Sequence, residues 1–303
     1  MRVLNFGSLN MDYVYQVEHM TRAGETQQSL SMEIFAGGKG LNQSIALSRA
    51  GVPVYHAGLV GDDGQLLLDT CKQNRIDSSF IRTIEGKGGH TIIQVDKGAQ
   101  NCIVLYGGSN NRITKEFVDE VMDFFTEGDL ILLQNEINLL DYIINRAYDK
   151  RMTIVLNPSP YNEKLDLCDL SKVSVFMMNE IEGSIISKGI TEPTKILDYM
   201  MKSYPSSKVV LTLGSDGAYY CDRKQRCYQA IFPVKAVDTT AAGDTYTGYF
   251  IYGMINKLPV EEILKLAACA SSIAVSRKGA VNSIPMMEEV KNALLLNDND
   301  LTN

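Results

Sequence analysis

The chain has 303 residues, enough for one large α/β domain with an appendage or for two domains. Its net charge is −7 and its basic residues are scattered, which argues against binding to nucleic acid or to an anionic membrane surface. The six cysteines form no CxxC pair and the three histidines lie far apart, so we expect neither zinc nor disulfides. No run approaches the roughly 18 apolar residues of a membrane span. We therefore expect a cytoplasmic protein with free thiols that binds small molecules.

Strand-like runs that end in polar or glycine-rich clusters recur along the chain, and helix-compatible stretches separate most of them. The predicted strands lie at 3–6, 54–59, 130–133, 153–156, 173–178 and 209–213, and the predicted helices include 114–125, 139–150 and 194–203. This alternation predicts a doubly wound α/β fold with a mostly parallel sheet. Ligands of such sheets bind beyond the carboxyl ends of the strands. We therefore expect polar residues that follow the strands, such as Gln134, Glu136 and Asn157, to share one cleft.

Two stretches, 13–35 and 89–106, interrupt the alternation. They contain short runs of alternating apolar and polar residues, such as Tyr13-Val14-Tyr15-Gln16-Val17, punctuated by Gly, Gln and Asn. The pattern predicts a small antiparallel sheet added to an α/β core that is formed by residues 1–12, 36–88 and 107–303. An edge extension of the main sheet is the alternative.

A glycine-rich loop, Gly37-Gly38-Lys39-Gly40, leads into a predicted helix with Gly51 as its C-terminal glycine. The loop is not a Walker A motif, because it lacks both the earlier glycine and the Ser or Thr after the lysine. It is not a dinucleotide fingerprint, since Gln43 stands where a third glycine is needed. Lys39 and Asn42 lie on one side of the first helical turn, beside bare glycine backbone. This surface suits a polyhydroxylated ligand.

A short predicted strand at 234–237 leads through a loop of small residues into a predicted helix. Ala241, Ala242 and Gly243 carry no bulk to shield their backbone N–H groups, which would bind a phosphate at the positive end of the helix dipole. Asp244, in the first turn, could take a proton from a hydroxyl that attacks this phosphate. The alternative is an ordinary acidic residue at the start of a buried helix.

Phosphoryl transfer depends on positioning and charge neutralisation, so a metal anchor and a nucleotide site should accompany the base. Asn179 and Glu182 lie three residues apart and would share a face of a helical turn, where they could hold Mg²⁺, in part through water. Capping of the following helix by Asn179 is the alternative. Gly214 and Ser215 form a tight turn after a buried strand, which is typical of a hairpin.

Several motifs occur together in a fixed order along nearly the whole chain. They are Gly7-Ser8-Leu9-Asn10-Met11-Asp12, the loop around Lys39, Asn157-Pro158-Ser159-Pro160, Asn179-Glu180-Ile181-Glu182, Thr212-Leu213-Gly214-Ser215, the loop before Asp244 and Arg277-Lys278-Gly279-Ala280. In this combination the chain resembles the ribokinase-like (phosphofructokinase-B type) family of carbohydrate kinases. The resemblance implies an enzyme that transfers phosphate from ATP to a sugar hydroxyl, and we expect D-ribose to be converted to ribose 5-phosphate.

The resemblance also assigns roles to residues. Those implied to hold the sugar are Asn10, Asp12, Gly38, Lys39, Asn42 and Glu136. Those implied for ATP are Asn179, Thr212, Gly214, Ser215 and Ala267, and the range 267–271 on a late helix is implied to lie near the adenine. Those that match a monovalent-cation site, with K⁺ as the expected ion, are Asp238, Thr240, Ala274, Arg277, Gly279 and Ser283. In the family, the small sheet is a lid over the sugar and often the surface of a dimer.

Two other functions stay open. A nucleoside kinase or another sugar kinase of the same family is possible, because Tyr13 or Tyr15 in the lid could stack on a base. A non-catalytic sugar sensor is less favoured, since Asp244 and the small residues of the anion hole are both retained. The alternating lid strands would leave an apolar face and unpaired edges, from which we expect a homodimer through the lids.

Overall fold

The computed structural model describes residues 1–98 and 100–300, with side chains through residue 296. Within these residues the larger sheet has the strand order β13-β12-β11-β10-β9-β8-β1-β4-β5. Its parallel strands are β1 (Val3–Phe6), β4 (Val54–Val60), β5 (Asp77–Thr83), β8 (Leu130–Gln134), β9 (Thr153–Asn157), β10 (Val175–Asn179) and β11 (Lys208–Thr212). An antiparallel hairpin of β12 (Ala218–Cys221) and β13 (Arg226–Gln229) extends one edge. The predicted fold class is confirmed.

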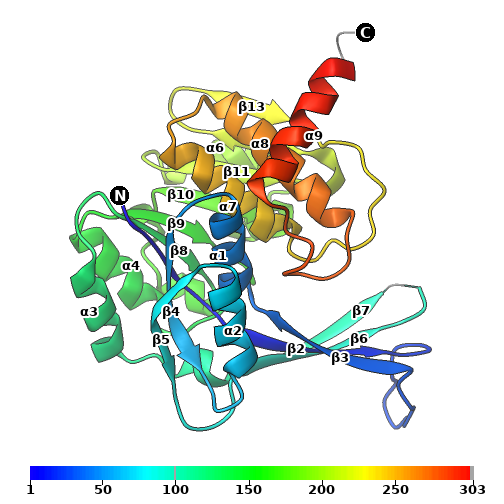
Figure 1. Ribbon diagram of the computed structural model, residues 1–303. Coiled ribbons are helices and arrows are strands. Elements are labelled where there is room, and N and C mark those ends of the chain that lie inside the picture. The colour runs from blue at the N-terminus through cyan, green and yellow to red at the C-terminus, as the bar shows by residue number, and fades with distance from the viewer. Residues whose placement is uncertain (99, 301–303) are drawn as a thin grey trace.

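Helices cover both faces of this sheet (Figure 1). One face packs against α1 (Lys39–Arg49), α2 (Gln65–Gln73), α7 (Ala242–Ile255), α8 (Val260–Val275) and α9 (Met287–Asp300). The other packs against α3 (Lys115–Phe124), α4 (Leu140–Asp149), α5 (Glu180–Ile186) and α6 (Pro193–Ser203). Short 3₁₀ turns occupy Gly108–Asn111, Glu163–Leu167, Leu170–Lys172 and Gly214–Asp216. None of the described helices is long and apolar enough to span a bilayer.

Local capping interactions mark two of the helix ends. The side chain of Thr114 caps α3 by accepting a hydrogen bond from the Phe117 amide at 3.2 Å. After α1, Gly51 has a φ of 95°, a conformation that costs glycine little and explains why the helix stops there.

A separate small sheet, of order β3-β2-β6-β7, projects from the core (Figure 1). Its strands are β2 (Asn10–Gln16), β3 (Ser31–Gly37), β6 (Gly89–Val95) and β7 (Asn101–Tyr106). The two outer pairs are antiparallel, whereas β2 and β6 in the middle run parallel. The sheet is thus an added unit rather than an edge extension of the larger one. Because β2 begins at Asn10, both Asn10 and Asp12 lie on this small sheet.

The prediction of a strand at 234–237 is wrong. The segment is an irregular loop between β13 and α7, and none of the described strands pairs with it. Instead, the amides of Val237 and Asp238 both donate to the Val275 carbonyl, at 2.8 and 3.2 Å, so the loop is held by the end of α8. Alternation of apolar residues cannot distinguish a strand from an extended loop that lies against a helix.

Candidate active site

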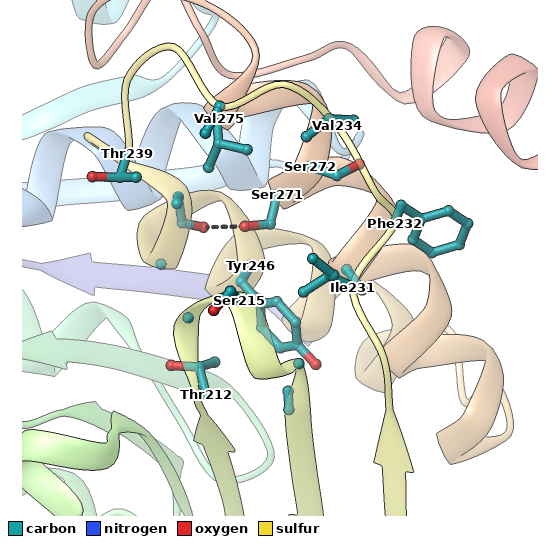
Figure 2. Close-up of a pocket in the computed structure, with 17 residues that line it drawn as sticks. Thr212, Ser215, Ile231, Phe232, Val234, Thr239, Tyr246, Ser271, Ser272 and Val275 are labelled. Atoms are coloured by element: carbon teal, nitrogen blue, oxygen red, sulfur yellow. Dashed lines mark hydrogen bonds between the residues drawn. The ribbon is translucent and has the colours of Figure 1, made fainter.

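Two cavities meet at the N-terminus of α7. The larger, of about 700 Å³, lies between the small sheet and the carboxyl ends of the main strands. The smaller, of about 350 Å³, lies between the loop after β13, the turn after β11 and helix α8 (Figure 2). Both are lined by Thr212, Gly214, Thr239, Ala242, Gly243 and Tyr246. A ligand in one cavity can therefore reach a ligand in the other beside the first turn of α7.

This end of α7 can accept an anion. Ala241 precedes the helix with a φ of 59°, and no side chain caps the first turn. The first amides of a helix have no intrahelical acceptor and carry the positive end of its dipole. A Cβ added at Gly243 would meet nothing within 4 Å, so open space lies beside that amide. The predicted anion-binding residues Ala241, Ala242 and Gly243 all line the larger cavity, although the Ala242 amide already donates to the Thr239 carbonyl at 3.3 Å.

Asp244 is buried at this helix end, with 6% of its surface exposed. Its Oδ1 accepts a hydrogen bond from Gln43 Nε2 at 2.8 Å, and its Oδ2 accepts one from Asn42 Nδ2 at 3.1 Å. Both donors lie on α1, which packs directly against α7. The packing of these two helices therefore holds the carboxylate in place.

A lysine stands among three carboxylates in the larger cavity. Burial alone would lower the pKa of Lys39, but the charges of Asp244, Glu136 and Glu182 outweigh it and raise this pKa. Glu136 Oε2 accepts hydrogen bonds from Ser8 Oγ at 2.5 Å and from the Lys39 amide at 3.0 Å. Burial raises the pKa of Glu136, although Lys39 acts against this. Lys39 is thus a positive charge placed where phosphate oxygens could arrive.

The polar groups at the small sheet are arranged to meet hydroxyl groups. Asp12 Oδ1 accepts a hydrogen bond from Thr91 Oγ1 at 2.6 Å, and burial raises the pKa of Asp12 to about 6. Asn42 Oδ1 is buried and has no hydrogen-bond partner among the described residues. Such an acceptor is costly unless a ligand satisfies it. The larger cavity is lined by all the residues that were expected to hold the sugar: Asn10, Asp12, Gly38, Lys39, Asn42 and Glu136.

Asn179 and Glu182 form a capping box at the start of α5. Asn179 Oδ1 accepts from the Ile181 and Glu182 amides at 2.8 and 3.0 Å, and Glu182 Oε2 accepts from the Asn179 amide at 3.0 Å. The helix cap that was the alternative to a metal site therefore exists. Both side chains also line the larger cavity. Among the described residues no cluster of three His, Cys, Asp or Glu could hold a metal. Glu182 fits Mg²⁺, which commonly binds one or two carboxylates together with water and phosphate oxygens.

The smaller cavity combines apolar walls with a few hydroxyls (Figure 2). Thr212, Gly214 and Ser215 line it as expected, while Gly214 also begins the turn between β11 and β12 that the hairpin interpretation required. Ala267, which was expected here, is fully buried in the hydrophobic core instead. Its neighbours on α8, Ala268, Ser271 and Ser272, line the cavity. Ala268 and Ser271 belong to the range 267–271 that was expected here, but the sequence alone could not tell which small residues of that range face the cavity.

Asp238 ties the loop before α7 to the loop after α8. Its Oδ1 accepts from the amide and the hydroxyl of Thr240 at 2.9 and 2.6 Å, and its Oδ2 accepts from the Gly279 amide at 2.9 Å. Burial opposes the charge of Asp238, but these hydrogen bonds outweigh it and lower its pKa. The other residues expected at a cation site are engaged locally: the Arg277 amide donates to the Ala274 carbonyl, and Ser283 Oγ donates to the Ala280 carbonyl.

Several residues of the site were missed from the sequence. Gln43 follows Asn42 directly, Ser8 lies in the motif at 7–12 and Thr91 lies in the stretch 89–106, but none was given a role. Gln134 was expected in the cleft with Glu136 and Asn157, and this is wrong, because Gln134 is fully buried. It is the last residue of β8 and faces α1, where it donates to Gln43. A polar residue at the end of a strand can serve the ligand or the packing below it, and the sequence does not decide between them.

Comparison with known proteins agrees with this geometry. A model of the pfkB family of carbohydrate kinases matches residues 2–287. The chain is 34% identical to the ribokinase of Staphylococcus aureus, over 95% of this chain and 98% of that protein. The solved ribokinase of Thermotoga maritima is similar with a TM-score of 0.88 and 29% identity, over 97% and 99% of the two chains. A ribokinase of Arabidopsis thaliana, solved with ribose and ATP, has a TM-score of 0.85 and 26% identity, over 97% and 98%. Because the family model and these relatives span almost the whole chain, it belongs to the pfkB family of carbohydrate kinases.

Proposed function

We propose that this enzyme phosphorylates D-ribose with ATP to give ribose 5-phosphate. The observation that carries the proposal is the meeting of two cavities at the N-terminus of α7, where Asp244 lines the larger cavity. The ribokinase relatives, and the Arabidopsis structure solved with ribose and ATP, support ribose and ATP as the two substrates. Ribose would lie in the larger cavity and the nucleotide would extend from the smaller one.

In this proposal the residues near the first turn of α7 have separate roles in phosphoryl transfer. Asp244 accepts the proton of the 5-hydroxyl as its oxygen attacks the γ-phosphate. The amides that begin α7 and the charge of Lys39 stabilise the negative charge that develops on the phosphoryl group. Glu182, with Asn179, would help to hold Mg²⁺, which neutralises the phosphates of the nucleotide.

Ribose should be used with a kcat/KM roughly tenfold or more above that for 2-deoxyribose. The 2-hydroxyl can pair with one of the polar groups near Asp12, and its loss leaves a buried group unpaired at a cost of about 1–3 kcal/mol. Steady-state kinetics with both sugars, and with a panel of hexoses and nucleosides, measures this. In the variant Asp12→Ala, the ratio of kcat/KM for ribose to kcat/KM for 2-deoxyribose should be smaller. Comparable efficiency with both pentoses, or a nucleoside used better than either, would overturn the assignment of ribose.

The raised pKa of Asp12 predicts that sugar binding depends on pH. The pKa of Asp12 is raised to about 6, so the acceptor form is lost as the pH falls through about 6. We expect the KM for ribose to rise below that pH, with less change in kcat. Thr91→Val removes a hydrogen bond that lowers this pKa, so the rise in KM should begin at a higher pH. An unchanged profile in Thr91→Val would show that another group controls sugar binding.

We also propose a monovalent-cation site at Asp238, Thr240, Ala274, Arg277, Gly279 and Ser283. An ion there would stabilise the loop that leads into the anion-binding turn, since Asp238 already joins that loop to Gly279. Activity should be higher in K⁺ than in Na⁺ at matched ionic strength, and Asp238→Ala should abolish the difference. Equal rates in the two salts would count against the site.

A homodimer through the small sheets is the assembly we propose. Exposed apolar side chains gather on its strands: Met32, Ile34, Ile92, Ile103 and Val104. Its outer strands β3 and β7 are unpaired on one side within the described chain, which favours pairing or cover by a second copy. Light scattering at micromolar concentration should report a dimer, and a monomer would refute the proposal. The six free cysteines are compatible with the cytoplasmic location that we propose.

A further inference from the structure

A row of buried polar side chains lies beneath α1, where the sheet would otherwise be apolar. Asn5, His56 and Gln134 come from the neighbouring strands β1, β4 and β8, and all three are fully buried. Val3 and Leu132 on the same strands belong to the hydrophobic core under α1. Placing amides and an imidazole in such a layer is unfavourable even when most of their polar groups are paired, and Gln134 Oε1 has no hydrogen-bond partner among the described residues. Because burying these polar groups is unfavourable, we looked for a function that the row could serve.

The hydrogen bonds of this row have a fixed direction that ends at Asp244. The amide of Gln134 donates to Gln43 Oε1 at 2.6 Å and to Asn5 Oδ1 at 3.0 Å. Since the oxygen of Gln43 is occupied by Gln134, the Nε2 of Gln43 is the group left to face Asp244 Oδ1, at 2.8 Å. A flipped Gln43 would place its oxygen against the carboxylate and its Nε2 against the amide of Gln134. Both new contacts would be repulsive.

The other branch of the row is equally constrained. Asn5 Nδ2 donates to the Gly40 carbonyl at 2.7 Å and to Ser44 Oγ at 2.8 Å. Ser44 Oγ lies 2.8 Å from His56 Nδ1, and His56 Nε2 lies 3.3 Å from the Gly7 carbonyl. Burial lowers the pKa of His56 to about 4, so the ring is neutral near pH 7 and has one donor and one acceptor. His56 Nε2 then donates to the Gly7 carbonyl and His56 Nδ1 accepts from Ser44 Oγ. This assignment fixes which group donates and which accepts in each hydrogen bond of the row.

We propose that Gln43 is a positioning residue for Asp244, and that Gln134 sets the direction of its amide. The inference rests on the proposed role of Asp244 as the base. Asn42 holds the second oxygen of Asp244 from the cavity side, whereas Gln43 holds the first from the protein interior. The buried row would keep the carboxylate in one orientation while ligands enter and leave. Gln43 would thereby act on the rate of transfer without touching either substrate.

The test is Gln43→Met, which keeps an unbranched side chain of similar length but removes the donor. We expect kcat to fall by about 10–100-fold, the loss of one hydrogen bond to a charged group, while KM for sugar and ATP changes less than about twofold. Ser207→Ala is the control, because it removes a buried hydroxyl that donates to the Val173 carbonyl in another part of the core. It should leave kcat unchanged. If Gln43→Met does not fold, Gln43→Met combined with Gln134→Met removes both members of the pair and is measured instead.

A double-mutant cycle distinguishes this inference from the proposed base. In an Asp244→Ala background, Gln43→Met should lower the residual rate by less than about twofold, since nothing remains to be positioned. The same fold-loss in both backgrounds, or a Gln43→Met variant with more than half of the wild-type kcat, overturns the inference and leaves the base standing. An Asp244→Ala variant that keeps most of its activity overturns the proposed base, and this inference with it.

Discussion

Replacing Asp244 with asparagine should lower kcat by ~10²–10⁴ while the protein stays folded. Asparagine has the same shape but cannot accept the proton of the attacking hydroxyl. Its amide would also face the amide of either Gln43 or Asn42, so one hydrogen bond is lost and a modest decrease in stability accompanies the loss of activity. The rate is measured with saturating ribose and ATP.

Binding measurements provide the control for this variant. Titration calorimetry with ADP should give nearly the same affinity for Asp244→Asn as for the wild type, since Asp244 lines only the larger cavity. More than half of the wild-type kcat in this variant would rule out Asp244 as the base.

The second large effect is expected at Gly248, where α7 touches α1. A Cβ added there would lie 2.4 Å from Ala46 Cβ and 2.7 Å from the Ala46 carbonyl carbon, distances that force the two helices apart. Gly248→Ala should therefore destabilise the fold by roughly 3 kcal/mol, at the upper end of overpacking effects. It should also lower kcat, because separation of the helices draws Asn42 and Gln43 away from Asp244. Thermal unfolding and steady-state kinetics measure the two effects.

Gly243→Ala is the matched control for stability. It adds the same methyl group to the same helix, but at a position where nothing lies within 4 Å of the new atom. Because alanine favours a helix over glycine by up to about 1 kcal/mol, its Tm should equal or exceed that of the wild type. If both variants unfold at the wild-type temperature, close packing at Gly248 does not hold the two helices together.

The fold could be predicted from the sequence largely because its local signals agree with one another. The alternation of strands and helices indicated the parallel sheet, and Gly51 marked the end of a helix through known capping geometry. The segment 234–237 failed because it has the composition of a strand but lies against the end of α8. Strand identity depends on a partner strand, and a single sequence carries little information on partners.

The site was predictable where a residue type itself suggests chemistry. A carboxylate in the first turn of a helix that follows a loop of small residues, as at Asp244, suggests a base beside an anion hole, and Asp244 lines the larger cavity. Gln43 and Gln134 gave no such signal, because an amide can face a ligand, solvent or another amide. Their contribution depends on which side of β8 and α1 they face, and that follows from packing in three dimensions. Ala267 and Ala268 are a similar case, because only the packing of α8 decides that Ala268, and not Ala267, lines the smaller cavity.

Two of the residues proposed to choose the sugar, Asn10 and Asp12, lie on a different part of the fold from the proposed base. Asn10 and Asp12 are on β2, within a sheet whose strands pair only with one another among the described residues, whereas Asp244 is on α7. Substitutions in the small sheet can therefore change substrate preference during evolution without disturbing the transfer machinery.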